Sequence, residues 1–231
     1  MPATPNPAPL SDVSSSMSRR RFMAGAAAAS FAVVAPGAVR TFAANSKINL
    51  GMIGCGGRGT WIAKLFKEHG GYNVVAAADY FQDRTDRLGD DVGVPASNRY
   101  TGLKGYLKLL DKVDAVAIIS PPYFHPEQAA AGVEAGKHVY LAKPIAVDVP
   151  GCLSIEDSGK TARQKKQCFL VDFQTRVDPF YMEALRRVHE ENALGTFAFG
   201  ECTYHAGDPF TSHYDTWKAD PENPENRLRA W

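Results

Sequence analysis

Residues 47–59 read KINLGMIGCGGRG, an apolar run that leads directly into glycines spaced as GxGxxG. In this spacing Gly54 permits a tight turn after a strand, Gly56 lets the backbone approach a diphosphate, and Gly59 lets helix and strand pack closely. A strand at 48–53 and an amphipathic segment at 60–69 supply the context that the pattern needs. The sequence therefore predicts a dinucleotide-binding turn. Its candidate cofactor-binding residues are Gly54, Cys55, Gly56, Gly57, Arg58 and Gly59.

A second apolar run, at 73–78, ends in Asp79, twenty residues after Gly59. A carboxylate at this distance is expected to bind the ribose 2'-hydroxyl of NAD and to repel the 2'-phosphate of NADP. Asp79 is therefore a candidate cofactor-binding residue, and NAD is the favoured cofactor. Arg84 lies close enough in sequence to keep NADP possible.

The chain after Asp79 continues to alternate strands and helices as far as residue 173. A continuous apolar run at 115–119 stops at two prolines, as expected for a parallel strand that is buried on both faces. An alanine-rich helix follows, and then a strand at 138–141. This alternation predicts an α/β fold with a doubly wound parallel sheet, whose ligand lies at the carboxyl ends of the strands.

Two further segments fall at those strand ends, Ser120-Pro121-Pro-Tyr-Phe-His125 and Ala-Lys143-Pro. Ser120 and Pro121 are candidate cofactor-binding residues. His125 opens a helix, whose dipole favours a neutral imidazole; it is either a hydrogen-bonding partner of the ligand or a half-buried capping histidine. Lys143 is the candidate catalytic residue, because an ammonium at the mouth of a nucleotide crevice orients and polarises a substrate hydroxyl. The alternative is an ordinary surface lysine.

The first 45 residues differ in composition from the rest, with one carboxylate, Asp12, and no lysine. Residues 18–23 read SRRRFM and precede a mildly apolar run at 24–39 and the small residues of TFAA at 41–44. This order resembles a twin-arginine export signal; the alternative is a disordered basic tail. The run is shorter than the roughly 20 residues of a membrane span. We expect cleavage near Asn45, no membrane anchor after processing, and a periplasmic or exported protein.

The 231-residue chain is 45% hydrophobic and 22% charged, with a formal net charge of +1. This is an ordinary globular composition, and nothing in it indicates nucleic-acid binding. The four cysteines form no CxxC pair and no cluster with histidines. The sequence therefore predicts no metal site and no disulfide framework.

Four stretches together are similar to the Gfo/Idh/MocA oxidoreductase family: GMIGCGGRG at 51–59, SPPYFH at 120–125, AGKHVYLAKP at 135–144 and RVDP at 176–179. The resemblance implies a Rossmann domain, here 46–150, followed by an α/β substrate domain on a largely antiparallel sheet, here the beginning at 151–231. It implies that Lys143 lies beside the nicotinamide and the substrate and that His125 lines the same pocket. It also implies a homo-oligomer for the full-length protein.

Two features depart from the family pattern. Position 142 is alanine where the family usually has glutamate, and family members continue for over a hundred residues past the position of Trp231 and supply a histidine acid/base. We therefore expect a C-terminally truncated second domain, with a helix at 178–192, a strand at 195–204 and an irregular segment at 206–231. His205 and His213 come too early to be assigned the acid/base role.

The function expected from this resemblance is an exported NAD(P)-dependent oxidoreductase that transfers a hydride between nicotinamide and a sugar, polyol or related small molecule. One alternative is an NAD-dependent glycoside hydrolase of the same family, which oxidises the sugar transiently and then restores it. The other alternative is a truncated nucleotide-binding module without turnover.

Overall fold

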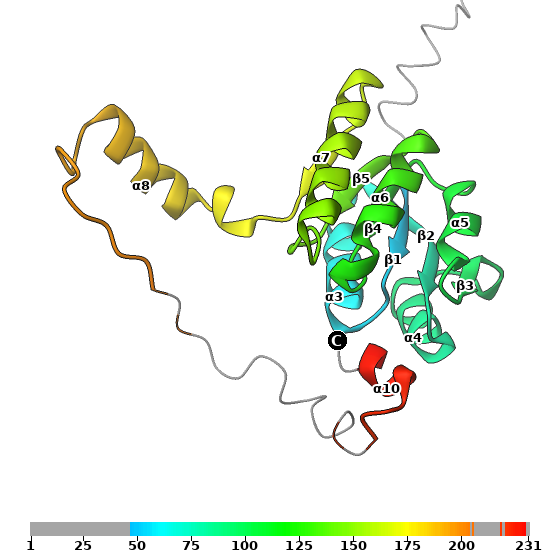
Figure 1. Ribbon diagram of the computed structural model, residues 1–231. Coiled ribbons are helices and arrows are strands. Elements are labelled where there is room, and N and C mark those ends of the chain that lie inside the picture. The colour runs from blue at the N-terminus through cyan, green and yellow to red at the C-terminus, as the bar shows by residue number, and fades with distance from the viewer. Residues whose placement is uncertain (1–46, 204, 206–217, 219, 230–231) are drawn as a thin grey trace, which may run out of the picture. The chain divides into compact units, whose positions relative to one another are not determined.

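A computed structural model describes residues 47–203, 205, 218 and 220–229, and six strands in this part of the chain form one parallel sheet. Their order across the sheet is β3-β2-β1-β4-β5-β6, so the chain starts in the middle and builds outward in both directions (Figure 1). This order confirms the predicted doubly wound Rossmann architecture. The strands are β1 (Ile48–Ile53), β2 (Tyr72–Asp79), β3 (Arg99–Thr101), β4 (Ala115–Ile118), β5 (His138–Leu141) and β6 (Phe169–Val171).

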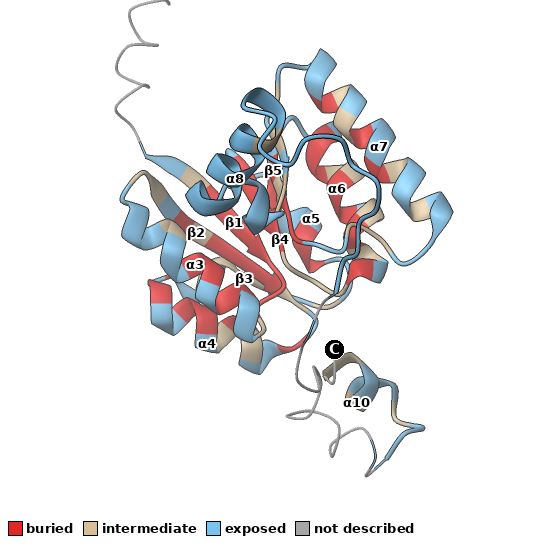
Figure 2. Cartoon of the chain, turned by 90° about the vertical axis from the view of Figure 1, so that its left-hand side faces the viewer, coloured by how far each residue is buried: buried red, intermediate tan, exposed pale blue. Residues whose placement is uncertain are grey.

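Helices cover both faces of the sheet, and the buried residues of the sheet lie in its four central strands, β1, β2, β4 and β5 (Figure 2). One face packs against α3 (Gly57–His69) and α4 (Gln82–Val92). The other packs against α5 (Gly105–Leu110), α6 (His125–Glu134) and α7 (Val149–Gln164). Short 3-10 turns connect some of these elements: η1 (Ala96–Asn98), η2 (Pro122–Phe124) and η3 (Gln174–Arg176).

The core consists of two apolar layers, one on each face of the sheet. Along β1, Met52 faces the α3 and α4 layer, and Ile53 faces the α5, α6 and α7 layer. Along β4, Ala117 faces the α3 and α4 layer, and Ile118 faces the α5, α6 and α7 layer. All four side chains are at most 2% exposed. The apolar runs of the sequence are continuous because successive side chains of a strand are buried on opposite faces.

The sheet extends beyond residue 150, where the resemblance placed the end of the first domain. Helix α7 begins after Asp148, whose side chain accepts a hydrogen bond from the Gly151 amide at 2.8 Å. Strand β6 then pairs in parallel with β5, with Leu141 opposite Val171. The helix and the strand that follow residue 150 therefore complete the Rossmann sheet. The boundary between the two predicted domains stays a prediction.

The expected helix at 178–192 is present as α8 (Pro179–Glu190), and Asp178 caps it by accepting the Phe180 amide at 2.9 Å. The expected strand at 195–204 was wrong for the described residues 195–203, which form no strand. A strand needs a hydrogen-bonded neighbour, and the described residues of this region pair with none. Phe199 is 84% exposed there.

The expectation of an irregular segment at 206–231 was wrong in part, because α10 (Pro224–Arg229) is helical. A proline at its first position and an acidic residue in its first turn, Glu225, favour a helix start. The Glu225 amide also donates to the Asn223 side chain at 2.9 Å. The twin-arginine motif, the expected cleavage site and His213 lie outside the described residues.

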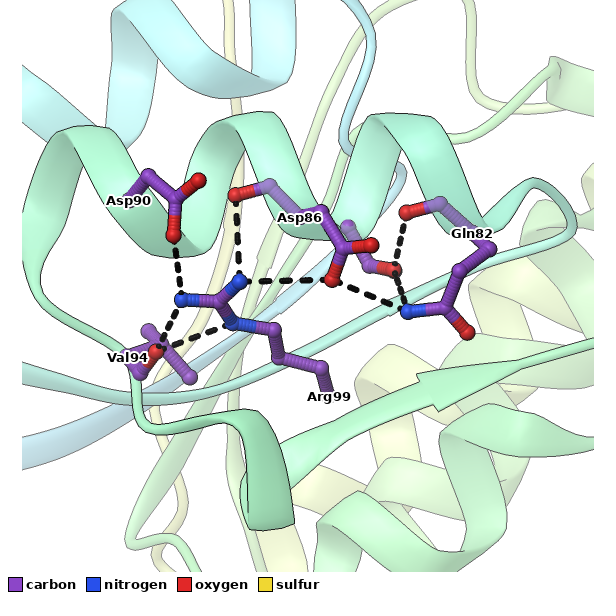
Figure 3. A network of polar contacts seen from close by, with 6 residues as sticks. Gln82, Asp86, Asp90, Val94 and Arg99 are labelled. Carbon is purple, nitrogen blue, oxygen red and sulfur yellow. Dashed lines mark hydrogen bonds and ion pairs between the residues drawn. The ribbon is translucent and has the colours of Figure 1, made fainter.

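Arg99, in β3, fixes the end of α4 against the sheet (Figure 3). Its guanidinium donates to the Val94 carbonyl at 2.8 and 3.0 Å and to the carboxylates of Asp86 at 3.2 Å and Asp90 at 2.8 Å. Gly89 leaves room for it, because a Cβ at that position would lie 2.2 Å from the Arg99 Nε. One arginine therefore joins α4 to β3, in addition to the apolar packing of Leu88 and Val92.

Leu109→Ala in α5 is expected to lower the free energy of unfolding by about 2–5 kcal/mol. Leu109 is 0% exposed and packs directly on the backbone of β1, where a Cβ on Gly51 would lie 2.3 Å from its Cδ2. Urea unfolding followed by circular dichroism measures the change. Leu107→Ala is the matched control, because Leu107 lies on the same helix and is 46% exposed. Equal unfolding midpoints for the two variants would contradict the assigned packing.

Candidate functional site

The glycine turn between β1 and α3 is held by two close backbone contacts. Gly54 has a φ of +94°, and a Cβ on it would lie 2.5 Å from the Ser120 amide nitrogen. A Cβ on Gly59 would lie 1.9 Å from the Gly54 carbonyl oxygen. Only glycine fits either position, so the predicted roles of both residues in the turn are consistent with the geometry. The carboxyl ends of β1 and β4 meet at this point.

The helix N-terminus beside the turn has the features of a diphosphate site. A Cβ on Gly57 would meet nothing within 4 Å, and one on Gly56 would come no closer than 3.8 Å, to Arg84 Nη1. The first amides of a helix have no carbonyl partner within it and attract anions. The open space beside Gly56 and Gly57 therefore lies next to the first backbone amides of α3, which have no partner within the helix. These residues fit the diphosphate of a dinucleotide.

Cys55 contributes its backbone to this site and buries its side chain. Its thiol lies 3.5 Å from the Ala78 carbonyl, and the residue is 1% exposed. Burial, with the neighbouring Asp79 carboxylate, raises the pKa of the Cys55 thiol well above its usual value. The amide of Cys55 donates to Asp79 Oδ2 at 2.7 Å. The thiol is therefore protonated at neutral pH and packs in the core.

Asp79 lies at the carboxyl end of β2, beside the turn, as predicted. Its Oδ1 accepts the Phe81 amide at 3.0 Å, while Oδ2 accepts the Cys55 amide. The side chain is partly exposed and lines a hollow that faces the turn. Each carboxylate oxygen accepts more than one hydrogen bond, so the group has the capacity to bind a ribose hydroxyl in the hollow.

The hollow brings together residues from five segments that are far apart in the sequence. They are the end of β1, the end of β2 with the start of α4, the segment before and within α5, the β4–α6 connection with the start of α6, and Leu228 in α10. Ser120 and Pro121 line it, as predicted, and Ser120 Oγ donates to Gln128 Oε1 at 2.6 Å. The main lining residues are Gly54, Asp79, Phe81, Arg84, Tyr106, Ser120, Pro121, Phe124, Gln128 and Leu228.

His125 has a different position from the one that the resemblance implied. It is 1% exposed, and its ring nitrogens lie 2.9 Å from the Pro144 carbonyl oxygen and 2.7 Å from the Ser120 carbonyl oxygen. Burial lowers the pKa of His125, and the carbonyls of Ser120, Pro144 and Ile145 oppose that change. The side chain therefore connects the loops after β4 and β5, beneath the surface where a ligand would lie.

Lys143 follows β5 at the same edge of the sheet. The preceding residue, Ala142, donates its amide to the Ile118 carbonyl at 2.9 Å, and the Lys143–Pro144 peptide is cis. His125 holds Pro144 from below. The Lys143 side chain is exposed. Its backbone is thus fixed next to the end of β4, and its exposed side chain is not among those that line the hollow.

Arg58, in the first turn of α3, forms an ion pair with Asp172. Asp172 comes directly after β6, and its side chain is 10% exposed. Burial, together with the Asp172 carboxylate to which the phenol bonds, raises the pKa of Tyr140. Asp172 was missed from the sequence; its place directly after a strand was the available signal, but β6 is only three residues long.

Among the described residues no group of histidine, cysteine or acidic side chains is arranged to hold a metal ion. No described helix has the length and apolar character that crossing a membrane requires.

Comparisons with known proteins agree with the geometry of the turn. The inositol 2-dehydrogenase 3 of Saccharopolyspora erythraea is 30% identical over 191 residues, which are 76% of this chain and 54% of that protein. The glycosyl hydrolase family 109 protein 4 of Phocaeicola vulgatus is 28% identical over 189 residues, 80% of this chain and 35% of that protein. The chain thus spans between a third and just over half of the length of these relatives.

A solved structure shows the same fold. The scyllo-inositol dehydrogenase of Lactobacillus casei, crystallised with NAD(H) and scyllo-inositol, superposes with a TM-score of 0.56 at 25% identity. The match covers 65% of this chain and 43% of that one. Residues 48–173, more than half of the chain, match the family model described as "oxidoreductase family, NAD-binding Rossmann fold". With its glycine turn, its sheet order and this match, the chain belongs to the Gfo/Idh/MocA family of NAD-binding oxidoreductases.

Proposed function

We propose that the protein transfers a hydride between the nicotinamide of NAD and a carbinol carbon of a sugar, polyol or related compound. The observation that carries the proposal is the shared hollow, in which the turn at Gly54, the carboxylate of Asp79 and the Ser120–Pro121 segment meet. Family membership supports the redox chemistry. The names of the relatives, which include inositol dehydrogenases, support a polyhydroxylated substrate.

The chain's own residues have separate tasks in this reaction. The turn and the first amides of α3 bind the diphosphate, and Asp79 binds the adenosine ribose. NAD, when bound, supplies the hydride acceptor. The exposed ammonium of Lys143 lies at the carboxyl edge of the sheet, where it orients the substrate hydroxyl and stabilises negative charge on its oxygen. His125 fixes the backbone that carries Lys143, through the Pro144 carbonyl.

A second candidate is an NAD-dependent glycoside hydrolase, because several relatives are named as members of glycosyl hydrolase family 109. Such an enzyme would oxidise the sugar transiently and then restore it. The two functions differ in what accumulates: NADH and an oxidised sugar in the first, and a free aglycone with unchanged NAD in the second. Incubation with NAD and either scyllo-inositol or a nitrophenyl N-acetylgalactosaminide separates them.

Export by the twin-arginine route is part of the proposal. The support is the order of arginines, apolar run and small residues in 18–44. A homo-oligomeric assembly stays a prediction from the family. N-terminal sequencing of protein recovered from the periplasm is expected to find a terminus near Asn45. A terminus at Met1 or Met17 in that fraction would contradict cleavage.

Asp79→Ser is expected to weaken NAD binding about tenfold or more, because a hydrogen bond to a charged group contributes about 1.5–3 kcal/mol. NADP binding should weaken less or improve, since the carboxylate no longer repels the 2'-phosphate. Calorimetric titration with both nucleotides measures the ratio of the NAD and NADP dissociation constants. Asp91→Ser is the control, because it removes an exposed carboxylate on α4. If the ratio of the two dissociation constants is unchanged in Asp79→Ser, Asp79 does not bind the ribose 2'-hydroxyl.

Lys143→Met is expected to reduce turnover about 10²–10³-fold, as removal of one stabilising donor does in other enzymes. NAD affinity should stay within about twofold, because Lys143 is assigned to the substrate and not to the diphosphate. Steady-state NADH formation and calorimetry give the two values. Lys112→Met removes an exposed lysine that precedes β4 at the opposite edge. Turnover that falls equally in both variants would remove the assignment.

A further inference from the structure

Helix α10 lies against the start of α4, although more than 130 residues separate them in the sequence. The Arg229 guanidinium donates to both carboxylate oxygens of Asp83, at 3.1 Å each. Its Cζ also lies 3.9 Å from the centre of the Phe81 ring. A bidentate ion pair together with a cation–π contact defines both the position and the orientation of the guanidinium.

The backbone of α10 is held at the same place by a second arginine. Arg84 donates to the Arg229 carbonyl at 2.9 Å, and its guanidinium carbon lies 5.1 Å from the centre of the Phe81 ring. The aromatic ring therefore contacts two guanidinium groups, one from α4 and one from α10. The contacts involve side chains and main chain, so they fix the last turn of α10 as a unit.

These contacts place α10 at the hollow that contains the predicted ribose ligand. Leu228 lines the hollow together with Asp79, Phe81 and Arg84. The Asp79 carboxylate also contributes to the raised pKa of Arg229, after the larger effect of Asp83. Leu228 thus adds an apolar side chain to the lining of the hollow beside Asp79, and Arg229 holds the adjacent backbone in place through Asp83.

We propose that α10 is part of the cofactor site and retains the adenosine half of a bound dinucleotide, with Arg229 as a positioning residue. The inference rests on the proposed NAD site. Leu228 forms a wall of the adenosine pocket, and the Arg229 contacts with Asp83 and Phe81 keep it there. The dinucleotide then leaves only when α10 moves, so the residues of α10 set the rate of release.

The test uses the purified chain and NADH, whose fluorescence reports its binding. In stopped-flow displacement by excess NAD, Arg229→Ala is expected to release NADH about tenfold faster than the parent chain, in line with the loss of a charge-assisted pair. Arg227→Ala is the matched control, because Arg227 lies on the same helix and is exposed. Its release rate should stay within about twofold of the parent value. Thermal unfolding confirms that both variants fold.

Binding of ADP tests whether α10 acts on the adenosine half of the dinucleotide. ADP contains the adenosine and the diphosphate but no nicotinamide, so Arg229→Ala is expected to weaken ADP binding by a similar factor. Asp83→Asn removes the partner of Arg229 on α4 and should accelerate NADH release in the same direction. The double variant should release NADH no faster than Arg229→Ala alone, because each single change already breaks the same Arg229–Asp83 ion pair.

The outcomes separate the two proposals. If the parent chain binds no NADH, the proposed function fails first. If the parent binds NADH and Arg229→Ala releases it at the parent rate, only the role of α10 is overturned. Tighter NADH and ADP binding in Arg229→Ala would also overturn it, because α10 would then occupy the place of the adenosine and compete with it.

Discussion

The contact between the first helix and the turn before it is the constraint on which the site depends. The Gly54 carbonyl oxygen lies 1.9 Å from where a Cβ on Gly59 would be, so helix and turn touch through main-chain atoms alone. The turn also has little space towards Ser120, which follows the neighbouring strand β4: a Cβ on Gly54 would lie 2.5 Å from the Ser120 amide nitrogen. This packing points the first amides of α3 towards the carboxyl edge of the sheet, where the anion-binding end of the helix becomes useful.

One carboxylate connects the shape of the turn with the lining of the hollow. Asp79 accepts the amide of Cys55 within the turn and that of Phe81 at the start of the next connection, and it also lines the hollow. In the proposed function the same carboxylate binds the ribose, so cofactor specificity would depend on the conformation of the turn. Arg84, which lines the hollow as well, partly balances the negative charge. Asp79 and Arg84 are therefore the charged residues that line the hollow.

The sequence was sufficient for the glycine turn, the sheet class and the position of Asp79 at the end of β2, because each depends on local spacing. It was less informative for His125, whose place at a helix start was correct but whose side chain was left open between a ligand contact and a half-buried position. The ring is buried between the Ser120 and Pro144 carbonyls, and no local pattern specifies partners 5 and 19 residues away. The expected strand at 195–204 failed for a related reason. Alternating aromatic and small residues favour a strand, but a strand also requires a neighbour to pair with.

By itself, the sequence determined the strands β1, β2, β4 and β5, the glycine turn and the residue types at the ends of those strands, because apolar periodicity and glycine spacing act over a few residues. Only the tertiary structure decided which of those ends share a hollow and which side chains reach across it. It paired Arg58 with Asp172 and Arg229 with Asp83. Such contacts join residues more than a hundred positions apart. The first forms because the parallel sheet brings the carboxyl ends of β1 and β6 to one edge, and the second because α10 lies against the start of α4, so both are properties of the assembled fold.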